Sequence, residues 1–176
     1  TSKLWNDKNW GTPEEQMQKT LTNLKVDYVD LYLIHNPCGG VDENGKMRNF
    51  PLHILWGEME KLLKKGLTRT IGVSNFNVQS LVNLLSFCEI PPAVNQYENN
   101  PYNQLPDLTK FCQRFNIHVT AFSPFFRGGI NNTGGTKVIG ARLDMFGDPV
   151  LVDIAKAHGR TVGQVIQHWL LLRGLS

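Results

Sequence analysis

The chain has 176 residues, of which 41% are hydrophobic and 19% are charged, and its formal net charge is +3. This composition is typical of a globular domain with one apolar core, and no run approaches the ~20 consecutive apolar residues of a membrane-spanning helix. The small net charge, and the lack of aromatic residues among the basic ones at positions 61–69, argue against a nucleic-acid partner.

The cysteines and histidines do not form a recognisable metal or disulfide pattern. The three cysteines, at positions 38, 88 and 112, are widely spaced and include no C-x-x-C pair. We therefore expect a reducing compartment, with the cytoplasm as the default location. His35 and Cys38 lack the second pair of ligands that a structural zinc site needs, so no metal site is expected.

Taken in chain order, short β-branched or aromatic runs alternate with amphipathic stretches, which predicts an α/β fold with parallel strands. Strands are predicted at the first residues (1–5) and at 28–35, 68–73, 93–97 and 118–122. Helices are predicted from near Thr12, which can cap the first of them, and at 52–65, 78–88, 106–115, 150–158 and 162–173. The segment 125–148, rich in Gly and Asn, is expected to be a lid or a mobile loop.

Polar residues stand where four of these strands end, in the strings YLIH, GVSN, VNQ and AFSP. The carboxyl ends of parallel strands meet at one edge of a sheet, and ligands bind at that edge in α/β folds. The sequence therefore predicts a ligand site at the carboxyl edge.

Five motifs in register resemble those of the aldo-keto reductase family. They are SKLW at 2–5, DLYLIH at 30–35, GVSNF at 72–76, VNQ at 94–96 and AFSP at 121–124. The resemblance implies that residues 1–176 are part of a (β/α)₈ TIM barrel, about half to two-thirds of it, from the end of barrel strand 3 to just before strand 8. It also implies an oxidoreductase that uses NADPH to reduce a small-molecule aldehyde or ketone.

The resemblance implies two catalytic residues. Lys3 matches the lysine whose ammonium lowers the pKa of a catalytic tyrosine, and that tyrosine is expected to lie outside this chain. His35 matches the histidine that orients the substrate carbonyl.

The resemblance also implies the cofactor and substrate contacts. Ser74, Asn75 and Gln96 match the residues that hydrogen-bond the nicotinamide carboxamide. Phe122 stands where a tyrosine usually stacks on the nicotinamide ring, and Ser123 follows it toward the pyrophosphate. Trp5 matches an aromatic wall of the substrate pocket, whereas Asn36 replaces a common tryptophan and predicts a more polar or roomier pocket.

Two other readings stay open. The chain can belong to a catalytically inactive barrel that serves as a binding or assembly subunit, because a fold alone does not confer chemistry. If 176 residues were the whole natural product, an open sheet would expose its strand edges and would be expected to aggregate or to recruit a partner. The oligomeric state and the identity of the carbonyl substrate do not follow from the sequence.

Overall fold

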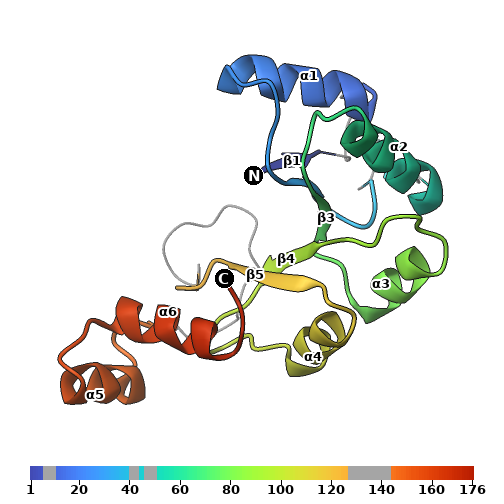
Figure 1. Cartoon of the computed structure of the whole chain (residues 1–176). Coiled ribbons are helices and arrows are strands. Elements are labelled where there is room, and N and C mark those ends of the chain that lie inside the picture. Colours follow the sequence, from blue (N-terminus) through green and yellow to red (C-terminus); the bar gives the residue numbers. More distant parts are fainter. Residues whose placement is uncertain (6–10, 40–43, 46–50, 127–143) are drawn as a thin grey trace. The chain divides into compact units, whose positions relative to one another are not determined.

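A computed structural model describes residues 1–5, 11–39, 44–45, 51–126 and 144–176 (Figure 1). The chain divides into two compact units. The first comprises Thr1–Tyr97 and Asp107–His118, and the second comprises Glu98–Pro106 and Val119–Ser176. Each unit is described by itself below.

Parallel strands form the centre of the first unit. They are β1 (Ser2–Leu4), β2 (Tyr32–Ile34), β3 (Ile71–Ser74) and β4 (Val94–Glu98), and they lie side by side in that order. In this register Lys3 lies beside Leu33, and Leu33 beside Gly72. A Cβ atom on Gly72 would lie 2.6 Å from the main-chain oxygen of Val94, so this glycine allows β3 and β4 to approach each other.

Strand β5 (His118–Phe122) follows β4 in the strand order, and both strands begin in the first unit and end in the second. In the first unit, His118 N donates to Ala93 O over 2.8 Å. In the second unit, Asn99 N donates to Phe122 O over 3.4 Å. The alternation of strands and helices, the parallel pairing and the (β/α)-type order agree with the predicted α/β class.

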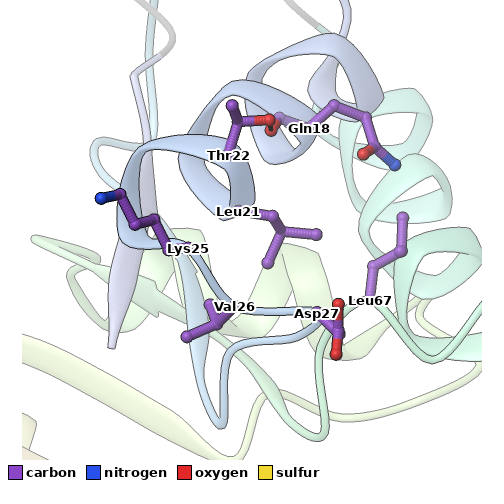
Figure 2. Close-up of a pocket in the computed structure, with 7 residues that line it drawn as sticks. All are labelled: Gln18, Leu21, Thr22, Lys25, Val26, Asp27 and Leu67. Atoms are coloured by element: carbon purple, nitrogen blue, oxygen red, sulfur yellow. Dashed lines mark hydrogen bonds between the residues drawn. The ribbon is translucent and has the colours of Figure 1, made fainter.

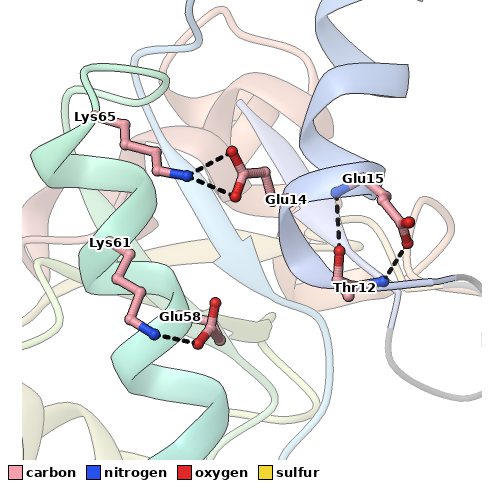
Figure 3. Close-up of polar contacts among 6 residues, drawn as sticks. All are labelled: Thr12, Glu14, Glu15, Glu58, Lys61 and Lys65. Carbon is pink, nitrogen blue, oxygen red and sulfur yellow. Dashed lines mark hydrogen bonds and ion pairs between the residues drawn. The ribbon is translucent and has the colours of Figure 1, made fainter.

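Helix α1 (Pro13–Leu24) begins after Thr12, as the sequence predicts, and Thr12 forms a capping box with Glu15 (Figure 3). The Thr12 hydroxyl accepts from Glu15 N over 3.3 Å, and the Glu15 carboxylate accepts from Thr12 N over 2.7 Å. Proline at the first helical position and two acidic residues in the first turn favour the same start. Two exposed ion pairs are drawn in Figure 3, Lys65 with Glu14 and Lys61 with Glu58, and such surface pairs contribute ~0–1 kcal/mol each.

Helix α2 (Leu52–Lys64) supplies the largest side chain of the core. Trp56 is 1% exposed, and its indole N–H donates to Ile90 O over 3.0 Å. Every residue of β2 and β3 is buried, as is typical of parallel strands with cover on both faces. The helix is followed by Gly66 at φ +73°, a left-handed conformation that glycine adopts without steric cost at helix ends.

The remaining helices of the chain also agree in place with the predictions. They are α3 (Val78–Leu85), α4 (Pro106–Arg114), α5 (Pro149–Ala157) and α6 (Val162–Leu172). Helix α3 is shorter than the predicted 78–88, because the chain turns after Leu85, where the Ser86 hydroxyl donates to Asn83 O. Strand β2 is shorter than the predicted 28–35, and its leading residues form only an isolated bridge between Val29 and Thr68.

In the second unit, α5 and α6 begin at side-chain caps. Asp148 accepts from two backbone N–H groups of α5, and Thr161 forms a capping box with Gln164 at α6. The last residues return to the sheet, where Leu175 forms a parallel bridge with Val119. Most of the segment predicted to be a lid, residues 127–143, lies outside the described residues. No helix in the described ranges has the length and apolar character needed to cross a membrane.

Candidate functional site

Within the first unit, predicted site residues lie at the carboxyl edge of the four parallel strands. Lys3 is in β1, Ser74 ends β3 and Gln96 is in β4, while His35 and Asn75 directly follow β2 and β3. Because the strands are parallel and nearly in register, residues up to 93 positions apart in sequence reach the same edge. The prediction of a polar carboxyl edge is confirmed for this unit.

A chain of hydrogen bonds crosses the edge from Lys3. The Lys3 ammonium donates to the Ser74 hydroxyl over 3.1 Å, and that hydroxyl donates to Gln96 O over 2.7 Å. Ser74 is completely buried. Burial lowers the pKa of Lys3, because the charged ammonium loses part of its hydration there.

Asn75 connects the ends of β2, β3 and β4 at this edge. Its φ of +62° lies in the left-handed region, which asparagine tolerates better than most residues. Its backbone N–H donates to Gln96 O over 2.9 Å. Its side-chain Nδ2 donates to His35 O over 2.9 Å and to Asn36 Oδ1 over 3.1 Å.

His35 is held from two sides. Its backbone N–H donates to Leu4 O over 3.1 Å, which continues the β1–β2 pairing past the end of the strands. The ring of Trp5 meets the imidazole edge to face, with centroids 4.3 Å apart and planes at 69°. This contact places the predicted aromatic wall directly against the predicted carbonyl-orienting histidine.

Gln16 supports Trp5 and was missed by the sequence reasoning. The Gln16 side chain, 9% exposed, accepts from Trp5 N over 3.2 Å and donates to Gly11 O over 3.5 Å. The residue belongs to no motif. Its only signal in the sequence is a polar side chain next to Met17, a fully buried residue of α1.

Phe122 and Ser123, predicted to contact the nicotinamide ring and the pyrophosphate, belong to the second unit. Ser123 has φ +48°, and its carbonyl accepts from Phe126 N over 3.0 Å and from the buried Asn100 over 3.4 Å. The backbone at Ser123 is thus fixed by a turn and by one buried side chain.

The carboxyl edge offers the polar atoms that a nicotinamide carboxamide needs. Both hydrogens of the Asn75 amide are used, but within the described part of the chain its Oδ1 has no hydrogen-bond partner. The side-chain amide of Gln96 likewise makes no hydrogen bond with any described residue. The nicotinamide carboxamide presents two N–H donors and one carbonyl acceptor. The Asn75 Oδ1 acceptor and the Gln96 side-chain amide, which can both donate and accept, complement it. The residues present therefore fit the cofactor that the resemblance implies.

A surface pocket lies elsewhere in the first unit. It measures about 340 Å³ and is lined by the end of α1, the segment that leads into β2, and Leu67 before β3 (Figure 2). These residues precede the strands, whereas His35 and Asn75 follow them. The pocket is therefore at the opposite end of the sheet from the polar residues. No group of three or more His, Cys, Asp or Glu side chains in the described ranges could hold a metal ion.

Comparison with known proteins agrees with this arrangement. The profile of the "Aldo/keto reductase family" matches residues 3–175. Aldose reductase B of Dictyostelium discoideum is 38% identical over 190 residues, with 99% of this chain and 57% of that protein covered. The (1S)-1,7-diacetoxy-luvungin A aldo-keto reductase of Citrus sinensis is 42% identical over 183 residues, with 100% and 55% covered.

Solved structures give the same result. A Bombyx mori aldo-keto reductase in complex with NADP superposes with a TM-score of 0.82 at 36% identity, over 99% of this chain and 55% of that one. An aldose reductase from Schistosoma japonicum gives 0.82 at 33% identity, over 99% and 56%. The chain therefore belongs to the aldo/keto reductase family, and its parallel sheet and helices are part of that family's (β/α)₈ barrel. The chain spans a little over half the length of these relatives.

Proposed function

We propose that the protein that contains this chain reduces aldehydes or ketones to alcohols with NADPH. The observation that carries the proposal is the hydrogen-bonded carboxyl edge of β1 to β4, where Lys3, His35, Asn75 and Gln96 come together. NADP in the related Bombyx mori structure, at 36% identity, supports the choice of cofactor. We further propose that residues 1–176 belong to one barrel domain and that the protein is cytoplasmic.

The cofactor would be held in this unit by side-chain amides. Asn75 and Gln96 would bind the carboxamide through the Asn75 Oδ1 acceptor and the Gln96 amide. Ser74 accepts one hydrogen bond and donates one, so its hydroxyl keeps a single lone pair for the same group. Phe122 would stack on the nicotinamide ring and Ser123 would follow toward the pyrophosphate. Bound NADPH supplies a hydride to the carbonyl carbon.

In catalysis, the residues of this chain would lower the pKa of the proton donor and orient the substrate carbonyl. We expect the proton donor to be a tyrosine outside this chain, with a free pKa of ~10 that is too high for an acid at neutral pH. The Lys3 ammonium favours the tyrosinate, and its partial burial makes that charge less screened than on the surface. His35 would donate a hydrogen bond to the carbonyl oxygen and so orient the substrate.

The substrate pocket would have Trp5 as one wall. The Trp5 ring meets His35 at 4.3 Å, so a carbonyl bound to the imidazole lies within reach of the indole. Asn36 stands where an indole is common in the family, and its smaller polar side chain leaves this part of the pocket wider. We expect small carbonyl compounds as substrates.

The direct experiment follows NADPH absorbance with the complete natural protein and a panel of small aldehydes and ketones. Consumption of NADPH that depends on the carbonyl compound supports the reductase. If the folded protein consumes no NADPH with any compound, the alternative of a binding or assembly subunit takes its place. A separate titration with NADPH then shows whether the inactive protein still binds the cofactor.

A further inference from the structure

The Asn36 side chain contacts a residue of the proposed cofactor site. Its Oδ1 accepts from Asn75 Nδ2 over 3.1 Å, and both residues are partly buried. Asn36 directly follows His35, whose main-chain oxygen accepts from the same Nδ2 over 2.9 Å. The end of β2 and the end of β3 are thus joined through one amide group.

The contact with His35 O determines which way the Asn75 amide faces. A main-chain carbonyl can only accept a hydrogen bond, so the atom that faces His35 O must be Nδ2 rather than Oδ1. The second hydrogen of Nδ2 then needs an acceptor, and Asn36 Oδ1 provides it. The Oδ1 of Asn75 remains as the acceptor for a ligand donor.

The residue type at position 36 decides whether this second bond exists. The resemblance places a tryptophan here in many family members, and an indole is a donor only, with no atom that could accept from Asn75. An aliphatic side chain could not accept either. The second restraint on Asn75 is therefore a property of asparagine at this position.

We propose that Asn36 is a positioning residue for the cofactor: it holds Asn75 so that Oδ1 is presented to the carboxamide of the nicotinamide. This inference rests on the proposed function and deepens it. It differs from the reading of Asn36 as a substrate contact, because it predicts an effect on cofactor affinity in the absence of any substrate.

The test measures NADPH binding to the complete protein by isothermal titration, with no carbonyl compound present. Asn36→Leu keeps the size of the side chain and removes the acceptor, and we expect NADPH to bind about 5-fold more weakly, the effect of one ordinary hydrogen bond. Asn36→Asp keeps an acceptor oxygen, and we expect binding within about 2-fold of the unchanged protein. Asn83→Leu, an exposed asparagine in α3, is the matched control and should change nothing.

A second ligand separates this inference from the proposed function. Adenosine 2′,5′-bisphosphate carries the adenosine part of the cofactor without the nicotinamide, so Asn36→Leu should bind it as tightly as the unchanged protein does. If the unchanged protein binds NADPH and Asn36→Leu binds it equally well, the positioning role is wrong while the proposed function stands. If the unchanged protein does not bind NADPH, the proposed function itself fails.

A double-mutant cycle with Asn75→Ala completes the test. If Asn36 acts through Asn75, Asn36→Leu should produce no further loss of NADPH affinity in the Asn75→Ala background. Additive losses would contradict the proposal. So would a higher KM for the carbonyl substrate at unchanged NADPH affinity, since that result would place Asn36 in the substrate pocket.

Discussion

Two polar arrangements, one in each unit, are held in different ways. At the carboxyl edge of the first unit, most hydrogen bonds end on main-chain oxygens of the sheet, namely Leu4, His35 and Gln96. In the second unit, Tyr102 is held by contacts between side chains. Its hydroxyl donates to Asp148 over 2.8 Å, and its ring meets Phe126 at 5.7 Å.

The difference has a consequence for robustness. Main-chain oxygens move only when the strands move. The hydrogen bonds at the carboxyl edge should therefore persist as long as the buried sheet stays folded. The second arrangement depends on single, largely exposed side chains, and Tyr102 is 38% exposed. Substitutions that disturb the sheet should therefore have large effects, whereas those at Tyr102 should have small ones.

The largest effect on stability is expected from Trp56→Ala. The indole is 1% exposed, and its removal would leave a cavity beneath the sheet and the Ile90 carbonyl without its donor. We expect a loss of about 3–5 kcal/mol in the free energy of unfolding, measured by urea denaturation of the complete protein. Trp56→Phe keeps most of the apolar volume and should cost clearly less. A loss below ~1 kcal/mol for Trp56→Ala would show that the packing of α2 contributes little to the stability of the core.

A smaller effect is expected from the titration of Tyr32 in β2. Burial raises the pKa of Tyr32 to about 12. Between pH ~10 and 12 the unfolded chain loses this proton while the folded chain keeps it, so the stability due to Tyr32 is complete below pH ~10 and is lost as pH rises.

The expected size of this alkaline loss is on the order of 2–3 kcal/mol, since each pKa unit corresponds to ~1.4 kcal/mol. Tyr32→Phe removes the group and should make the decline of stability above pH ~10 shallower by that amount. Urea denaturation of both proteins from pH 8 to 12 measures it. Parallel stability curves for the two proteins would contradict the burial argument.

The smallest effect is expected from Tyr102→Phe in the second unit. The substitution removes the hydroxyl that donates to Asp148 and leaves the ring contact with Phe126 intact. Because the pair is exposed, we expect a change within ~0.5 kcal/mol in the free energy of unfolding. A loss above ~2 kcal/mol would show that the second unit depends on this contact as much as the first unit depends on its sheet.

The sequence predicts the elements well because their signals are local. The capping box at Thr12 and the strand over His118–Phe122 occur where periodicity and cap residues place them. The bounds of β2 and α3 differ from the prediction. Pairing with neighbouring strands decides the extent of β2, and turn hydrogen bonds decide where α3 ends, and both depend on neighbours in space.

The candidate site is predicted less completely than the fold. Polar residues at strand ends indicate which side chains share an edge, and the family motifs indicate their roles. The contact between Asn36 and Asn75 could not be predicted, because it depends on the left-handed backbone of Asn75 and on a separation of 39 residues. The support of Trp5 by Gln16 is missed for a similar reason, since a single glutamine in a helix carries no signal of its partner.

The central claim, that Lys3 and its neighbours form the catalytic edge of a carbonyl reductase, is tested most directly by Lys3→Met in the complete protein. Lys19→Met, an exposed lysine of α1, is the matched control. We predict that kcat for NADPH-dependent carbonyl reduction falls by ~100-fold or more in Lys3→Met alone. A kcat within ~3-fold of the unchanged protein would contradict the account.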